Sequence, residues 1–144
     1  MPYIKIWIHL IFSTKNRESY ITNELKPELI SHIRANAKEK DIFIDQLNAV
    51  KDHIHILLSL GSDQSISKIA QLIKGESSHW INSNKMSKYK FTWQEEYIAL
   101  SVSESIVDKV REYIKHQEEH HKRRSFSKEF DILLKKHGFV WLKP

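Results

Sequence analysis

The stretch that most constrains this chain covers residues 52–58, with the sequence DHIHILL. Its alternation predicts a β-strand, because successive side chains on a strand point to opposite faces. His53 and His55 then share one face, and the aliphatic side chains share the other. Two imidazoles about 6–7 Å apart along a strand, which rises about 3.3 Å per residue, can converge on one metal ion. The alternative interpretation is two polar residues on a solvated sheet face.

Length and composition limit the class of protein. A chain of 144 residues can form its own core, and we expect one domain over residues 1–144 with a short helical tail at about 123–144. The absence of cysteine excludes disulfides and thiolate metal sites. Without an apolar run of about 18 residues or a signal peptide, we expect a cytoplasmic protein with no membrane partner. A formal net charge of +5 weakly indicates a polyanionic partner.

Hydrophobic periodicity predicts an α+β fold. Amphipathic helices are expected at about 24–40 and 65–82, and strands at residues 4–12, 42–50, 53–60 and 97–102. Strand, helix, two strands, helix, strand is the order of a ferredoxin-like antiparallel sheet with helices packed on one face. We expect a third, long helix from about residue 103 through Tyr113 to about residue 122, and a short one at about 127–136.

Tyr113 and Gln117 lie four residues apart on the third predicted helix and therefore on one helical face. Without the histidine pair, Tyr113 would be interpreted as an aromatic core residue and Gln117 as a polar residue at the edge of the core. With the histidine pair, a divalent metal held by His53, His55 and the Gln117 amide oxygen would keep open positions that polarise a phosphate ester. Tyr113, once activated, could attack that phosphorus. A set of imidazole and oxygen ligands is suited to Mg²⁺ or Mn²⁺ and does not exclude Zn²⁺.

Over nearly its whole length the chain resembles the single-tyrosine HUH transposases, where HUH stands for His-hydrophobic-His. These are small insertion-sequence transposases that act on single-stranded DNA, together with the REP-associated tyrosine transposases. The strongest matches are DHIHIL at 52–57 and YIKHQ at 113–117. The further matching segments are WIHLIFSTKNR at 7–17, IKGESS at 73–78, FTWQ at 91–94 and YIALSVS at 97–103.

The resemblance implies a role for each matching residue. His53, His55 and Gln117 would bind the metal, and Tyr113 would be the catalytic nucleophile. It would become joined to a 5′ phosphate and release a 3′ hydroxyl, which can later reverse the reaction on another DNA end. Members of this family recognise DNA hairpins and many are homodimers, in some of which the tyrosine helix completes the partner's site. The resemblance therefore implies single-stranded hairpin DNA as the partner, rather than a small-molecule substrate.

Several assignments stay open at this stage. The residues expected to contact nucleic acid are Lys15, Arg17, Lys74, Arg123 and Arg124. His9 is expected to be packed or hydrogen-bonded in the sheet, and His120 and His121 to be further ligands or part of a solvated helix end. The segment after Gln117 is similar to that of the REP-associated branch, which leaves open a domesticated nuclease that processes REP hairpins.

Three other functions remain as alternatives to a transposase. The first is a non-catalytic single-stranded nucleic-acid-binding protein on the same fold. The second is a metal hydrolase without covalent chemistry, which would not need Tyr113. The third is a structural protein with a surface histidine pair, which would not depend on metal.

Overall fold

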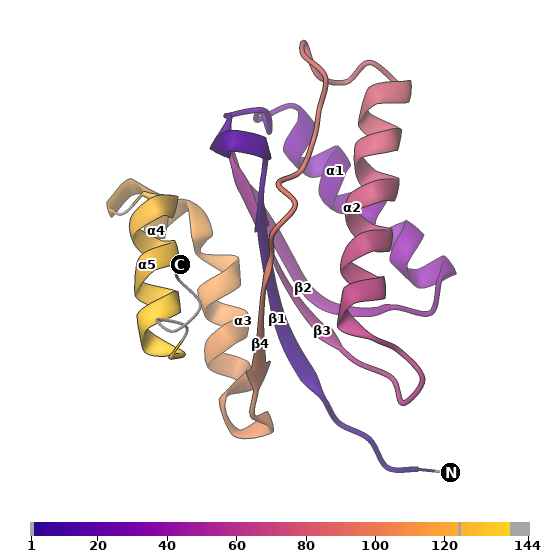
Figure 1. Ribbon diagram of the computed structural model, residues 1–144, viewed down its shortest axis with the longest axis vertical. Coiled ribbons are helices and arrows are strands. Elements are labelled where there is room, and N and C mark those ends of the chain that lie inside the picture. Colours follow the sequence, from indigo (N-terminus) through magenta and orange to yellow (C-terminus); the bar gives the residue numbers. More distant parts are fainter. Residues whose placement is uncertain (1, 124, 139–144) are drawn as a thin grey trace.

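The computed structural model describes residues 2–123 and 125–138 and contains a four-stranded antiparallel sheet with helices on both faces (Figure 1). The strands are hydrogen-bonded in the order β2-β3-β1-β4, which confirms the predicted ferredoxin-like α+β fold. In chain order, the elements are β1 (Trp7–Ser13), the 3₁₀ turn η1 (Lys15–Arg17), α1 (Leu25–Glu39), β2 (Phe43–Val50), β3 (His53–Ser59), α2 (Ile66–Ser83), β4 (Ile98–Val102), the 3₁₀ turn η2 (Glu104–Ile106), α3 (Val107–Lys115), α4 (Gln117–Arg123) and α5 (Phe126–Lys136).

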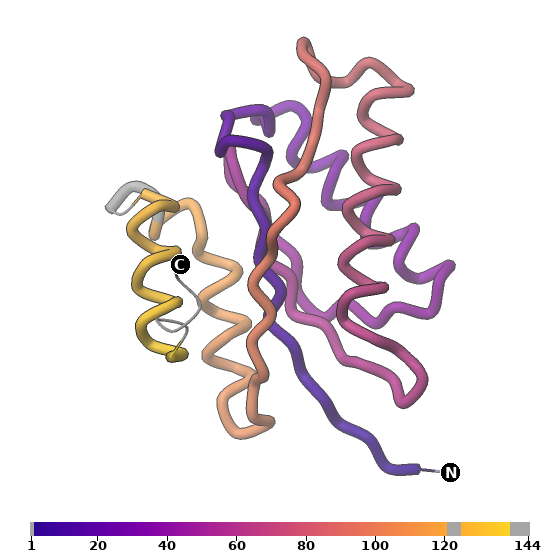
Figure 2. Tube along the Cα trace, viewed as in Figure 1, coloured from indigo at the N-terminus to yellow at the C-terminus, as the bar shows by residue number. Residues whose placement is uncertain are grey.

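The two central strands, β1 and β3, alternate between the faces of the sheet as predicted. Leu10, Phe12, Ile54 and Ile56 belong to the main core cluster with α1 and α2 and are at most 2% exposed. Figure 2 shows α1 and α2 on one side of the sheet, and α3 and α5 on the other. No helix among the described residues combines the length and apolar character needed to cross a membrane.

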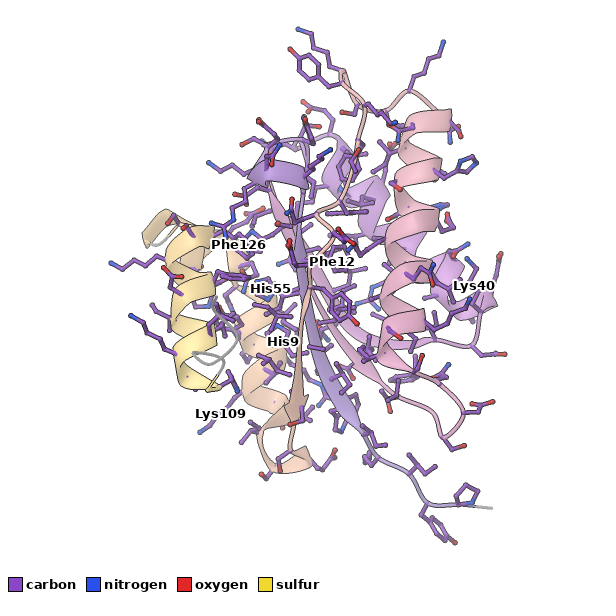
Figure 3. The ribbon with its side chains drawn as sticks, in the orientation of Figure 1. His9, Phe12, Lys40, His55, Lys109 and Phe126 are labelled. Atoms are coloured by element: carbon purple, nitrogen blue, oxygen red, sulfur yellow. The ribbon has the colours of Figure 1, made fainter. Side chains whose placement is uncertain are left out.

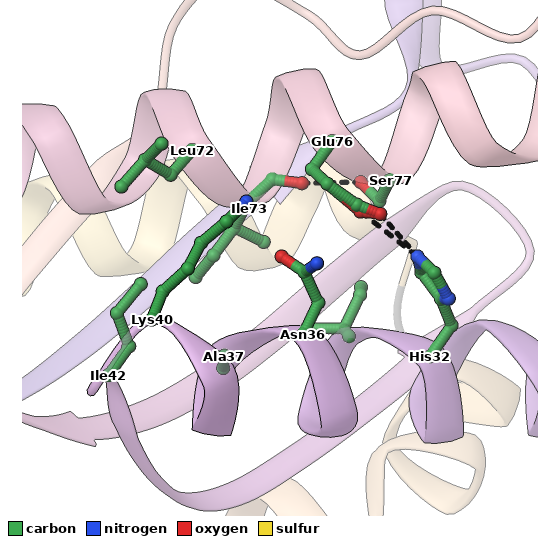
Figure 4. Close-up of a pocket in the computed structure, with 10 residues that line it drawn as sticks. His32, Asn36, Ala37, Lys40, Ile42, Leu72, Ile73, Glu76 and Ser77 are labelled. Carbon is green, nitrogen blue, oxygen red and sulfur yellow. Dashed lines mark hydrogen bonds and ion pairs between the residues drawn. The ribbon is translucent and has the colours of Figure 1, made fainter.

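A small pocket lies between α1 and α2 (Figure 4). His32 of α1 contacts the carboxylate of Glu76 on α2, and the His32 ring stacks on Trp80 with centroids 4.0 Å apart. These contacts join the two helices on the sheet face opposite the one that carries His53 and His55. We therefore assign this pocket to helix packing rather than to the predicted metal site.

The sheet face that carries His53 and His55 is buried as well. Helix α3 packs over it through a cluster formed by Trp7, Leu57, Val102, Val107 and Ile114. Helix α5 packs on the same face through a cluster formed by Ile11, Ile98, Leu100 and Phe126. The histidine pair therefore lies between two layers of the protein, which contradicts the alternative of a solvated sheet face.

The long helix expected over residues 103–122 is divided at His116 into α3 and α4. Asn48 of β2 donates its side-chain amide to the carbonyl oxygens of Ile114 and Lys115, at 2.8 and 3.3 Å. An unbroken helix would pair these carbonyls with amides four residues later. The prediction of one continuous helix was wrong because this contact comes from a distant strand, which helical periodicity does not reveal.

Arg111 and Asp45 anchor α3 to the edge strand β2. The Arg111 guanidinium donates from Nε and Nη2 to the two carboxylate oxygens of Asp45, at 2.8 and 2.9 Å. The register of β2 against β3 shifts at this position, and such irregularities turn a side chain away from its regular direction. The hydrogen bonds from Arg111 hold the pKa of Asp45 below its usual value. The tyrosine helix is therefore held in place by an ion pair as well as by apolar packing.

We predict that Asp45→Asn destabilises the protein at neutral pH and has little effect in acid. A carboxyl group with a lowered native pKa stabilises the fold above its unfolded pKa of about 3.9, and this contribution is lost as the pH falls through the native value. Urea midpoints of wild type and variant should differ at pH 7 and converge as the pH falls below the unfolded value of about 3.9. Asp108→Asn is the control, because Asp108 also contacts Arg111 but is 92% exposed. Equal losses in both variants would contradict this assignment.

Candidate active site

His53 and His55 of β3 are 0% and 1% exposed beneath α3 and α5. Phe126 of α5 stacks on the His53 ring with centroids 4.0 Å apart. Figure 3 shows His9, His55 and Phe126 gathered between the sheet and these helices, whereas Phe12 lies on the opposite side of the sheet. The alternation of one strand thus places both imidazoles in a covered site and anchors the strand by its aliphatic face.

Each imidazole of the pair is held at its Nδ1 atom. Asp52 Oδ1 lies 2.9 Å from Nδ1 of His53, and Nε2 of His9 lies 2.8 Å from Nδ1 of His55. A histidine that donates from Nδ1 keeps the lone pair of Nε2 for a metal, and such hydrogen bonds also fix the orientation of the ring. His9 is therefore the packed and hydrogen-bonded sheet residue that the sequence predicts.

Burial lowers the pKa of both His9 and His53, but neighbouring groups shift the two pKa values differently. Burial lowers the pKa of His9 well below its usual value, and the neighbouring His55 lowers it further. Burial is also the largest influence on His53 and lowers its pKa, but hydrogen bonds and charges from Asp52 and Glu129 together raise that pKa above its usual value. Asp52 and Glu129 thus place negative charge beside the buried His53 ring.

A carboxylate from α5 completes the cluster. Glu129 is 2% exposed, and its Oε1 lies 3.0 Å from Nε2 of His55 and 3.4 Å from Nε2 of His53. Within the described residues, one ligand atom from each of these three side chains lies within 4.8 Å of the other two. Imidazole nitrogen and carboxylate oxygen are ordinary ligands of divalent first-row metals. The donor set therefore fits a divalent metal ion.

Tyr113 of α3 lies beside this cluster and donates its hydroxyl to Glu129 Oε2 at 2.5 Å. Its ring stands edge-on to that of His55, with centroids 5.6 Å apart. The ring of His120 stacks on Tyr113 at 4.7 Å, so His120 contacts the predicted nucleophile, while the side chain of His121 lies outside the described part. One chain therefore brings Tyr113 together with its own histidine pair.

Gln117, the third predicted ligand, is 0% exposed at the start of α4. Its Nε2 donates to the carbonyl oxygen of Tyr113 at 3.2 Å, so the two residues remain in contact although their helix is divided. Its Oε1 is buried and has no hydrogen-bond partner among the described residues. A buried amide oxygen without a hydrogen-bond partner costs folding free energy, and binding a metal ion would remove this cost. Oε1 of Gln117 is therefore suited to serve as a metal ligand.

Arg17 is the predicted nucleic-acid contact that adjoins this site. Its guanidinium lies 5.3 Å from the ring centroids of both Phe126 and Phe130 on α5. The three side chains line a pocket on one side of α5. A second pocket, between α3 and α5, is lined by residues that include Lys109, Tyr113 and Lys136. Basic side chains that the sequence analysis did not single out thus line the same pocket as Tyr113.

The other predicted nucleic-acid contacts lie elsewhere or outside the described residues. Lys15 is exposed in η1. Lys74 of α2 donates to the carbonyl oxygen of Glu95 at 2.7 Å, and α2 covers the opposite sheet face. The side chain of Arg123 and all of Arg124 lie outside the described part of the chain. These residues stay predictions.

Glu129 is the central residue that sequence reasoning missed. The periodicity predicts a helix in this region, but no motif assigns that helix a function. A usable signal does exist, since Phe126, Glu129, Phe130 and Leu133 follow helical spacing and share one face. A carboxylate in the middle of an apolar stripe is an unusual core residue that needs a partner.

Comparison with known proteins shows which family this chain resembles. A family model described as IS200-like transposases matches residues 3–117. The ISDra2 transposase TnpA of Deinococcus radiodurans is 27% identical over 114 residues, which cover 76% of this chain and 81% of that protein. The transposase of insertion sequence IS200 from Salmonella typhimurium is 29% identical over 119 residues, which cover 79% of this chain and 78% of that protein.

Solved structures share the same fold. A crystal structure described as a transposase from Deinococcus radiodurans has a TM-score of 0.64 at 24% identity, over 81% of this chain and 93% of that chain. A REP-associated tyrosine transposase bound to a REP hairpin also has a TM-score of 0.64, at 18% identity, over 84% of this chain and 72% of that chain. The resemblance stated from the sequence is confirmed by the family match, and the fold by these structures.

We predict that Asp52→Asn weakens Mn²⁺ binding by about tenfold, because groups that orient metal-binding histidines contribute affinity of this order. Isothermal titration calorimetry on the full chain measures the change. Asp63→Asn, at an exposed position after β3, removes the same charge without touching the site and serves as the control. Wild-type affinity in Asp52→Asn would refute the orienting role, and an equal loss in the control would point to net charge instead.

Proposed function

This chain belongs to the family of IS200-like transposases, and we propose that it nicks and rejoins single-stranded DNA through a covalent bond to Tyr113. One observation carries the proposal. The Tyr113 hydroxyl contacts a carboxylate that also touches both imidazoles of the buried histidine pair. A nucleophile and a set of metal-binding side chains in contact with each other are what covalent phosphoryl transfer with a metal cofactor requires.

The proposed cofactor is Mg²⁺ or Mn²⁺, with Nε2 of His53, Nε2 of His55 and Oε1 of Gln117 as ligands. Such an ion, when bound, polarises a phosphate oxygen as a Lewis acid. The support from this chain is twofold. Asp52 and His9 hold the two imidazoles at Nδ1, and Gln117 presents a buried oxygen that has no hydrogen-bond partner among the described residues.

Tyr113 supplies the nucleophilic oxygen in the proposed reaction. Attack of Oη on a DNA phosphorus forms the bond to the 5′ phosphate and breaks the bond from phosphorus to the 3′ oxygen. The proton lost by the phenol balances the proton gained by the 3′ oxygen. Because one ester replaces another, the released 3′ hydroxyl can attack the phosphotyrosine bond in turn. The strand is then rejoined without an external energy source.

The proposed substrate is single-stranded DNA that folds into hairpins. A REP-associated relative with the same fold is bound to such a hairpin. Arg17, Lys109 and Lys136 line the pockets on the two sides of α5, and their charged groups are suited to DNA phosphates. Lys15, Lys74, Arg123 and Arg124 are further proposed phosphate contacts.

We propose that the protein acts on DNA as a homodimer in the cytoplasm of a prokaryotic cell. We propose that each subunit completes its own site, and the contact between Tyr113 and His55 of the same chain supports this. A dimer would therefore serve to hold two DNA ends together for strand transfer.

We predict that Tyr113→Phe abolishes the covalent product and leaves Mn²⁺ binding largely intact. Hairpin DNA from the flanks of the gene, labelled at its 3′ end, is incubated with protein and Mn²⁺ and run on a denaturing protein gel. Wild type should give a labelled band at the mass of the protein, which a chelator removes. Tyr89→Phe is the control, because Tyr89 is 63% exposed and distant in sequence from the site.

Other outcomes would contradict the proposal or favour an alternative function. A covalent band that persists in Tyr113→Phe would refute Tyr113 as the nucleophile. Cleaved DNA without any covalent band would favour a metal hydrolase. Hairpin binding without cleavage, over a panel of hairpins and with either metal, would favour the non-catalytic binding protein.

A further inference from the structure

The reaction described above gives Glu129 no chemical role, although Glu129 contacts His53, His55 and Tyr113. We propose that Glu129 is a metal ligand, so that metal binding docks α5 onto the active site and holds Tyr113 beside it. This inference rests on the proposed function and extends it to the C-terminal part of the chain. The family match ends at residue 117, so that α5 lies beyond it.

The first argument is the spacing of the ligand atoms. Two atoms that each bind one ion at about 2.1 Å, with an angle of about 90–110° between the bonds, lie about 3.0–3.4 Å apart. Glu129 Oε1 lies 3.0 Å from Nε2 of His55 and 3.4 Å from Nε2 of His53. Both distances therefore equal the separation of neighbouring ligands around one ion.

The second argument is charge. Glu129 is 2% exposed, and a buried carboxylate is stable only if opposite charge or hydrogen bonds replace the lost water. A neutral imidazole that donates from Nδ1 has no proton at Nε2 to donate to Glu129. A divalent cation would attract the carboxylate more strongly and would use the lone pairs of both Nε2 atoms. A single ion would thus contact all three side chains.

The third argument is that the two carboxylate oxygens of Glu129 have different partners. Oε1 faces the two histidines, and Oε2 accepts the hydrogen bond from the Tyr113 hydroxyl at 2.5 Å. One carboxylate therefore connects the metal position with the nucleophilic oxygen. Glu129 is in this respect a positioning residue for Tyr113 as well as a ligand.

The packing of α5 explains why ligation would affect the whole helix. Phe126, one turn before Glu129, stacks on His53 and forms an apolar cluster with Ile11 and Leu100. Glu129 lies on the same helical face as Phe126 and Phe130. A bond between the metal and Glu129 would add a link at the centre of this face. The docked state of α5 should therefore be stabilised by metal.

The test measures metal binding and helix docking on the full chain. Mn²⁺ affinity is measured by calorimetry for wild type, Glu129→Gln, Glu129→Asp and the control Asp131→Asn, which removes a charge at an exposed position of the same helix. We expect Glu129→Gln to weaken Mn²⁺ binding by roughly tenfold or more, Glu129→Asp to retain part of the affinity, and Asp131→Asn to match wild type. Hydrogen exchange over residues 126–136 should slow on addition of Mn²⁺ in wild type but not in Glu129→Gln.

The outcomes separate this inference from the proposed function. Wild-type Mn²⁺ affinity in Glu129→Gln, or tighter binding, would overturn the assignment of Glu129 and leave the histidine site standing. If the rate of hydrogen exchange in α5 of the wild type is the same with and without Mn²⁺, the proposed link between metal binding and helix docking is wrong. If wild type binds no Mn²⁺, the proposed metal site itself fails. Circular dichroism of Glu129→Gln verifies that it is folded, and Glu129→Asp provides the second variant.

Discussion

The site depends on one constraint, which is that Nε2 of His53 and Nε2 of His55 face a shared position inside a buried layer. The two-residue period of β3 puts both imidazoles on one face, and a slip of one residue would exchange them with the aliphatic residues of the core. Asp52 and His9 hold the rings at Nδ1. Helices α3 and α5 then close the layer and bring Tyr113 and Glu129 to the same position. Sheet, helices and hydrogen bonds all support this convergence.

Much of this arrangement could be predicted from the sequence because it follows from local periodicity. The alternation over residues 52–58 predicts that both histidines lie on one face. The order of strands and helices predicts the ferredoxin-like antiparallel sheet. The division of the tyrosine helix could not be predicted in this way, because it involves Asn48, which is more than sixty residues earlier in the chain. The role of Glu129 could not be predicted for a similar reason, since its partners come from β3 and α3, although its place in an apolar stripe marks it as unusual.

The C-terminal helix changes how the site should be understood. The motif residues His53, His55, Tyr113 and Gln117 lie within the segment that matches the family, and α5 follows it. Yet Phe126 and Glu129 of α5 make direct contacts with both histidines and with the tyrosine. The chemistry of the motif and the docking of the tail are therefore physically linked in this chain.

The most direct test of the account is a crystal of the protein soaked in Mn²⁺, with diffraction recorded to locate anomalous scattering by manganese. The account predicts one dominant peak within bonding distance of Nε2 of both His53 and His55, beside the hydroxyl of Tyr113. A dominant peak at another place, for example at His32 and Glu76 between α1 and α2, would contradict it. So would the absence of any peak at the histidine pair at saturating Mn²⁺.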